Sequence, residues 1–184
     1  MITVEETKLP GVYIITPKAF GDNRGWFMES YSKKDLEEAG ITADFVQDNR
    51  SFSSKKGIIR GLHFQRSPKT QAKLLSCIRG EIMDVAVDLR KDSPTYKQWV
   101  SVVLSAENRK QIYIPKGFAH GFVTLSDDVE IMYKCDEFYA PETDGGIRWN
   151  DPDVGVEWGI TDPVLSDKDK NHPFLSEIEE SLDF

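Results

Sequence analysis

The chain has 184 residues, of which 39% are hydrophobic and 29% are charged, a composition typical of one folded domain and not of a disordered segment. Its formal net charge of −8 argues against a general nucleic-acid-binding protein, which needs a basic face. We see no spanning helix and no signal peptide, and two cysteines are too few for a disulfide framework, so we expect a cytoplasmic protein without membrane segments.

Short segments rich in Val, Ile, Tyr and Phe, separated by Gly, Pro, Asn and Asp, predict a chain made mostly of strands. In chain order we expect strands at residues 12–16, 26–31, 43–47, 58–64, 72–78, 82–89, 99–104, 111–114, 120–125 and 129–135. The clearest pattern is at 82–89, where Val85 and Val87 alternate with Asp84 and Asp88, as in a strand with one buried face. Many short strands at near-even spacing favour a sandwich, a jelly roll or a barrel.

Few helices are expected. Ser32 followed by Asp35 predicts a helix start, Gly40 can end that helix, and residues 176–179 predict a short helix near the C-terminus. The stretch from about residue 151 contains three prolines, and we expect it to be irregular and to wrap the surface. No linker divides the chain, so we expect a single domain, 1–184.

Three stretches contain the residue types that catalysis needs. They are RGLHFQ at 60–65 with Lys73 after it, IPKGFAHGF at 114–122, and Tyr133 with YAPE at 139–142 and WNDP at 149–152; LSDKD follows at 165–169. In order and spacing, along nearly the whole chain, these motifs resemble the dTDP-4-dehydrorhamnose 3,5-epimerases, a family of nucleotide-sugar enzymes. The resemblance implies an all-β cupin jelly roll with a few short helices, which forms a homodimer.

The resemblance also implies an isomerase reaction, the inversion of C3 and C5 in dTDP-4-dehydro-6-deoxy-D-glucose to give dTDP-4-dehydro-L-rhamnose. That product leads to dTDP-rhamnose for lipopolysaccharide or other cell-wall polysaccharides, and the family uses no cofactor and no metal. A hydrogen beside a ketone is acidic because its carbanion delocalises onto the carbonyl oxygen, and C4 activates both C3 and C5. Such an enzyme needs a base on one face of the sugar, a cation at the enolate oxygen and an acid on the other face.

His63 has the residue type and the motif position of the base, because much of an imidazole is neutral at physiological pH. The resemblance pairs this histidine with Asp169, whose carboxylate would fix the ring tautomer and stabilise the imidazolium. An isolated histidine is more often a hydrogen-bonded core residue, but the full set of motifs favours the catalytic interpretation.

Lys73 and Tyr133 are expected to point inward from their strands. Lys73 shares a strand face with Leu75 and Cys77, where a developing enolate would compensate its charge. The alternative is a lysine of an edge strand that extends to water. By the resemblance, Tyr133 is the acid that reprotonates the carbanion, although most inward tyrosines on strands serve packing.

The resemblance also assigns residues to substrate binding. Arg24 and Arg60 would bind the phosphates, Arg24 across the dimer, and Tyr139 would stack on the thymine. The other matching positions are Glu29, Gln47, Asn49, His120, Asp144 and Lys168. Asp144 stands where some members have a longer glutamate. Strict alternation puts Arg60 and His63 on opposite strand faces, so we expect a bulge at Gly61 that redirects one of them.

The motif ending at His120 is similar to the second cupin motif, whose histidine commonly binds a metal. The first cupin motif would supply two further histidines, but His63 is followed by Phe64 and Gln65, so we expect no metal. Three alternatives stay open: an enzyme that inverts only C3 or only C5 of a related dTDP-4-keto-deoxysugar, a metal-dependent cupin oxygenase, and a sugar-binding cupin without turnover.

Overall fold

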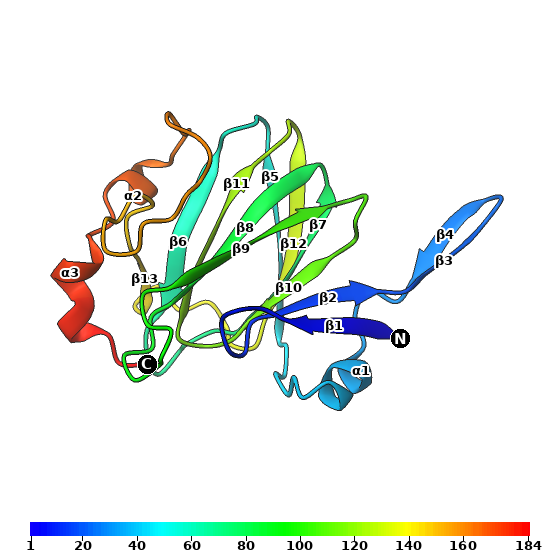
Figure 1. Ribbon diagram of the computed structural model, residues 1–184, viewed down its shortest axis with the longest axis horizontal. Coiled ribbons are helices and arrows are strands. Elements are labelled where there is room, and N and C mark those ends of the chain that lie inside the picture. The colour runs from blue at the N-terminus through cyan, green and yellow to red at the C-terminus, as the bar shows by residue number, and fades with distance from the viewer.

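Two antiparallel sheets lie face to face in the computed structural model, which describes residues 1–184 (Figure 1). The six-stranded sheet contains, in spatial order, β1 (Ile2–Glu6), β2 (Tyr13–Pro17), β10 (Gln111–Ile114), β7 (Lys73–Arg79), β12 (Val129–Cys135) and β5 (Gln47–Ser53). The five-stranded sheet contains β13 (Asp144–Gly146), β6 (Ile59–Gln65), β11 (Phe118–Thr124), β8 (Glu81–Asp88) and β9 (Trp99–Ser105). Strands distant in sequence are neighbours, as in a jelly roll, and this confirms the expected all-β class.

The main core lies between the two sheets. Leu75 and Ile131 from the six-stranded sheet pack in one buried cluster with Ala86 and Phe122 from the five-stranded sheet. Full burial of a Leu, Ile or Phe side chain contributes roughly 2 kcal/mol to folding. The apolar inner faces of both sheets therefore hold the sandwich together and position the cavity described below.

The outer face of the five-stranded sheet is buried as well. Val85 and Val87 of β8 pack in a second cluster with Trp158, Leu175 and Leu182 of the C-terminal segment. That segment contains α2 (Asp167–Lys170), α3 (Leu175–Ile178) and a 3₁₀ turn (Glu179–Ser181), and Figure 1 shows α2 and α3 beside β6. The predicted apolar face with Val85 and Val87 is therefore buried under the C-terminal segment, but the prediction of only one buried face was wrong, because the face with Asp84 and Ala86 points into the sandwich and is buried as well.

The predicted helix after Ser32 is confirmed as α1 (Lys33–Glu38). The Ser32 hydroxyl accepts a hydrogen bond from the Asp35 backbone N–H at 3.3 Å, and Gly40 follows the helix with a φ of +84°. Leu36 is buried against Ile15 of β2 on the outer face of the six-stranded sheet. None of the helices has the length and apolar character needed to span a bilayer.

The position of β5 differs from the prediction, since the expected strand at 43–47 ends at the residue where β5 begins. Gln47, Asn49, Ser51 and Ser53 are its less exposed residues, and they alternate with exposed Asp48, Arg50 and Phe52. The period of two is present, but the less exposed face is entirely polar and the exposed face carries the one aromatic ring. Hydrophobicity could not reveal this strand because its inner face lines a polar cavity. β1, β3 (Ala19–Asp22), β13 and α2 were also not predicted.

A two-stranded hairpin projects away from the sandwich. It consists of β3 (Ala19–Asp22) and β4 (Gly25–Met28), and Figure 1 shows it extending beyond the end of β2. Three of its aromatic side chains are exposed, Phe20, Trp26 and Phe27, the last with 72% of its surface accessible. An apolar hairpin of this kind has no core of its own to bury these rings.

Candidate active site

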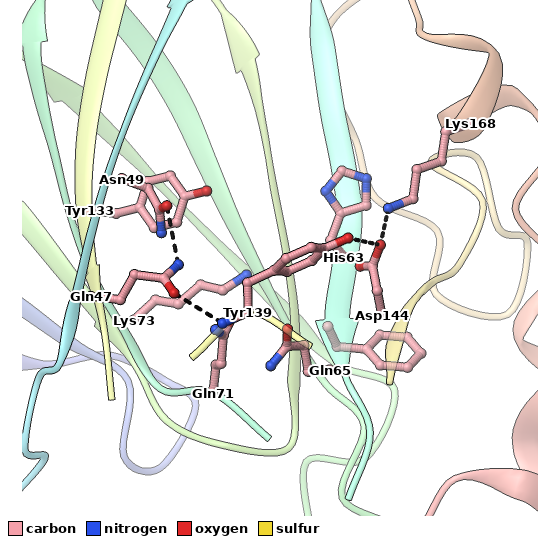
Figure 2. A pocket seen from close by; sticks show the side chains of 11 residues that line it. Gln47, Asn49, His63, Gln65, Gln71, Lys73, Tyr133, Tyr139, Asp144 and Lys168 are labelled. Atoms are coloured by element: carbon pink, nitrogen blue, oxygen red, sulfur yellow. Dashed lines mark hydrogen bonds and ion pairs between the residues drawn. The ribbon is translucent and has the colours of Figure 1, made fainter. Parts of the chain in front are cut away.

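A polar cavity opens between the two sheets at the end where β5, β6, β7 and β12 meet (Figure 2). Its volume is about 300 Å³, which is at the lower end of the range of about 300–1,000 Å³ usual for small-molecule sites. A second, adjoining cavity shares four of its lining residues, His63, Lys73, Tyr133 and Lys168. The two cavities together form one groove that both sheets line.

His63 and Asp169 form a hydrogen-bonded pair at the wall of this groove. The His63 Nε2 and Asp169 Oδ1 atoms are 2.5 Å apart, and Asp169 is only 3% exposed. Burial alone would raise the pKa of Asp169, but the hydrogen bond and charge of His63 and the bond from Ser166 lower it below its usual value. Asp169 is thus a carboxylate, and His63 keeps its Nδ1 atom for another partner.

A bulge in β6 brings His63 and Arg60 to the same groove. His63 pairs with His120 and Arg60 with Phe122, so a three-residue step on β6 faces a two-residue step on β11. Gly61 lies inside this step with a φ of +133°, a conformation that side chains with a Cβ rarely adopt. The predicted bulge is confirmed, and it explains how two residues of opposite strand parity line one cavity.

Tyr133 lines the groove from the other sheet. It lies on β12, half-buried against the main core, whereas His63 lies on β6 of the facing sheet (Figure 2). Burial raises the pKa of the Tyr133 phenol, and only the charge of Arg60 acts in the opposite direction. The hydroxyl is therefore protonated at neutral pH and can donate a proton. An imidazole and a protonated phenol thus line one cavity from opposite sides.

Lys73 lies at the start of β7, which is paired on both sides by β10 and β12. The alternative of an edge-strand lysine is therefore wrong, and the side chain lines both parts of the groove. Burial lowers the pKa of the ammonium, while the neighbouring Cys135 thiol and the Asp84 and Asp144 carboxyl groups act in the opposite direction. An incoming anionic group would favour the charged form of this lysine.

His120 reaches the groove from β11 and is held by a residue that the sequence analysis did not select. Its Nε2 atom lies 2.8 Å from Asp84 Oδ2, and Asp84 is fully buried on β8. Burial raises the pKa of Asp84, whereas His120 and Lys73 lower it. One feature of the sequence could have identified Asp84 as a site residue: it is an acidic residue within the most regular strand pattern in the chain.

Gln47, Asn49, Tyr139, Asp144 and Lys168 also line the cavity, and Tyr139 and Lys168 are the exposed members of this group (Figure 2). The Gln47 side chain donates to Asn49 Oδ1 at 3.2 Å and accepts from the Tyr139 backbone N–H at 2.9 Å. Tyr139 donates to Asp144 at 3.3 Å, and Asp144 forms an ion pair with Lys168. The Tyr139 side chain is 56% exposed, so a flat ligand can approach it.

Two further glutamines, which the sequence analysis did not assign, line the cavity or support its rim. The Gln65 amide donates to the carbonyls of Lys69 and Phe138 and accepts from the Ala140 backbone N–H at 2.9 Å. Gln71 donates to the Glu137 carbonyl at 2.8 Å. Both residues fix the loop that carries Tyr139. Gln65 lies within the RGLHFQ motif, which was the signal for it.

Arg60 and Arg24, the two arginines predicted to bind phosphate, lie in different parts of the molecule. Arg60 lines the groove, and its guanidinium donates to Ser53 Oγ at 3.1 Å. Arg24 lies at the tip of the hairpin, paired with Asp22 and 85% exposed. Glu29, just after the hairpin, is 3.6 Å from the N-terminal amine. Within one chain, neither Arg24 nor Glu29 lines the groove.

One cluster in the site offers metal-ligating atoms. His63, Asp169 and His172 each provide one such atom, and all three atoms lie within 4.8 Å of one another. His172 was assigned to an irregular tail, but it is buried beside His63, with 5.4 Å between the ring centroids. Burial and the charge of His63 lower the pKa of His172. No sequence motif indicates this contact, because His172 meets His63 only through the path of the C-terminal segment.

Comparison with known proteins gives matches along nearly the whole chain. Residues 6–177 match the family model described as dTDP-4-dehydrorhamnose 3,5-epimerase. The enzyme of that name from Shigella flexneri is 53% identical over 171 residues, which cover 92% of this chain and 94% of the relative. Two crystal structures of such epimerases superpose with a TM-score of 0.93.

The structure from Bacillus anthracis, with TDP and PPi bound, is 52% identical and covers 95% of this chain and 100% of its own. The structure from Legionella pneumophila, in complex with dTDP-4-keto-L-rhamnose, is 47% identical and covers 98% of this chain and 96% of its own. Sequence, fold and the residues gathered in the groove agree. The chain belongs to the dTDP-4-dehydrorhamnose 3,5-epimerase family, isomerases with the cupin fold.

Proposed function

We propose that this protein inverts C3 and C5 of dTDP-4-dehydro-6-deoxy-D-glucose and releases dTDP-4-dehydro-L-rhamnose. One observation carries the proposal: His63 and Tyr133 come from facing sheets and line the same cavity, which Lys73 also lines. Family membership and the bound ligands of the two similar crystal structures support the choice of substrate.

His63 is the base in the proposed reaction. Its Nδ1 atom takes the proton from C3 or C5, and the electron pair of the C–H bond moves into the C4 carbonyl to form an enolate. Asp169 stabilises the imidazolium that results, and the Lys73 ammonium stabilises the charge on the enolate oxygen. Tyr133 then donates its proton to the opposite face of the carbon. Solvent returns a proton to Tyr133 and removes one from His63, so the atoms balance and no redox partner is needed.

The nucleotide lies at the open side of the groove in this proposal. Arg60 binds the phosphates, and Tyr139 stacks on the thymine. Gln47, Asn49 and Lys168 contact the nucleotide or the sugar, as does His120 from within the groove. Asp144 is already paired with Lys168, so its role is to orient that lysine as much as to contact the substrate.

We further propose a homodimer of single-domain subunits, 1–184, in which the hairpin of each chain completes the partner's groove. The exposed aromatic rings of β3 and β4 and the distance of Arg24 from its own groove support this arrangement. The family's reaction and two free cysteines support a cytoplasmic enzyme of dTDP-rhamnose synthesis for lipopolysaccharide or other cell-wall polysaccharides.

Incubation with the ketosugar in deuterium oxide tests the function. The wild type should place deuterium at both C3 and C5 of an L-configured product, measured by NMR. Deuterium at C3 alone would support the mono-epimerase alternative instead. His63→Ala should abolish turnover and still bind the nucleotide, a result that a sugar-binding cupin without turnover does not predict.

Tyr133→Phe separates proton abstraction from inversion. Because abstraction comes first, the variant should still exchange substrate hydrogen with solvent while forming little inverted product. Its deuterium content and product configuration are read from the same spectra. Loss of exchange together with inversion would show that Tyr133 is not simply the late acid.

A further inference from the structure

His172 has a buried ring nitrogen that no protein group satisfies. The residue is 8% exposed, and its Nε2 atom has no hydrogen-bond partner. The ring is tightly confined, because a Cβ placed on Gly146 would lie 2.7 Å from that nitrogen. Buried polar groups are nearly always paired, so an orphaned nitrogen that faces two other ligand atoms indicates an absent partner.

The neighbouring atoms are those of a metal site. The His172 Nε2 atom is 3.7 Å from Asp169 Oδ1, which in turn is 2.5 Å from His63 Nε2. Two imidazoles and one carboxylate form a common ligand set for zinc, at metal–ligand distances of about 2.0–2.2 Å. Ligands of a tetrahedral ion at those distances are about 3.3 Å apart, so small side-chain movements create the site.

We propose that His63, Asp169 and His172 form an inhibitory site for a divalent transition-metal ion such as Zn²⁺. The ion enters through the groove and replaces the proton between His63 and Asp169. The displaced proton moves to Nδ1 of the neutral His63 ring. That ring then has no free lone pair with which to accept a proton from the sugar. Binding itself is independent of the proposed function, and only its inhibitory effect rests on it.

This site differs from the metal position of other cupins, which uses the histidine that His120 matches. His120 is bonded to buried Asp84, and Gln65, two positions after His63, is engaged with the rim loop. The proposed ion is held by β6 and the C-terminal segment, with ligands from positions 63, 169 and 172. His120 therefore offers a matched control.

Metal binding is tested on chelator-treated, full-length enzyme titrated with Co²⁺ and with Zn²⁺. The wild type should bind one ion per chain, with the visible absorption of Co²⁺ held by nitrogen and oxygen ligands. His172→Asn should weaken this binding at least about a hundredfold, because the loss of even an outer-shell partner costs about 10–100-fold, whereas His120→Asn should retain it. Equal binding by wild type and His172→Asn, or loss in His120→Asn alone, would overturn the proposal.

Inhibition is tested in the same preparations by deuterium exchange. Zn²⁺ should block exchange in the wild type and a chelator should restore it, whereas the exchange rate of His172→Asn should be the same with and without Zn²⁺. Should His172→Asn not fold, as judged by circular dichroism, His172→Gln fills more of the space and must show the same loss of binding. If the wild type binds Co²⁺ but does not epimerise the sugar, the proposed function is refuted and the metal site stands. If the wild type is active but binds no Co²⁺, the metal site is refuted and the proposed function stands.

Discussion

Asp169 links the C-terminal segment to the proposed proton transfer. Its backbone N–H donates to Ser166 Oγ at 3.1 Å, which fixes the start of α2, and its side chain meets His63. A carboxylate in that position orients the imidazole and stabilises its charged form. The short helix α2 therefore positions the carboxylate that orients His63.

Asp169→Asn should keep the fold and lose rate. The amide is nearly the same size, but it carries no charge and can favour the wrong tautomer of His63, so kcat should fall at least about a hundredfold with KM little changed. Steady-state kinetics and circular dichroism measure both. Asp144→Asn is the matched control and should act mainly on KM, because Asp144 is paired with Lys168; an equal fall of kcat in the two variants would contradict the distinction.

Individual site residues could be predicted where a local motif contains them. His63, Lys73 and Tyr133 each lie in a short pattern of their own, and all three line the groove. Asp84 and His172 could not be predicted in the same way. Their roles depend on contacts with His120 and with His63, and strand pairing and the path of the C-terminal segment create those contacts.

The bulge in β6 determines which side chains line the groove. A regular strand would place Arg60 and His63 on opposite faces, and only one of them would line the cavity. The bulge was predictable because Gly61 lies between two polar residues that both had to face the substrate. β5 was not predictable by the same method, because its inward residues, Gln47, Asn49 and Ser51, are polar.

Gly61→Ala should disrupt this element. Its new Cβ would lie 2.5 Å from the Gly121 Cα atom, in addition to the strain of a φ of +133°. We expect a loss of about 3 kcal/mol in the free energy of unfolding, measured by urea denaturation, and reduced activity in the folded fraction. Gly25→Ala is the matched control, since Gly25 has a φ of +136° and nothing within 4 Å of a Cβ. Equal losses would mean that strain, not the contact with β11, requires Gly61.

The hairpin separates two sets of predicted site residues. Eleven of the thirteen predicted site residues line the groove. The other two, Arg24 and Glu29, lie in or next to the hairpin. The sandwich buries its own core, but the aromatic rings of β3 and β4 stay exposed. A second copy of the chain would both cover these rings and receive Arg24.

Mixed dimers test whether Arg24 acts in the partner's groove. Arg24→Ala and His63→Ala proteins should each show little activity at low substrate concentration. After the two are unfolded together and refolded, about half of the dimers are hybrids with one intact groove, so about a quarter of wild-type activity should return. Refolded single variants are the control. No recovery, in a preparation shown by sedimentation to contain dimers, would place Arg24 in its own chain's groove or outside the site.

The projecting hairpin also has a consequence for how the enzyme responds to its own abundance. If each groove needs a neighbour's hairpin, an isolated chain is folded and yet incomplete, and mass action sets the fraction that works. Specific activity should then fall on dilution below the dissociation constant and return on concentration. Newly synthesised chains would be inactive until they dimerise, so catalysis would begin with assembly and not with folding.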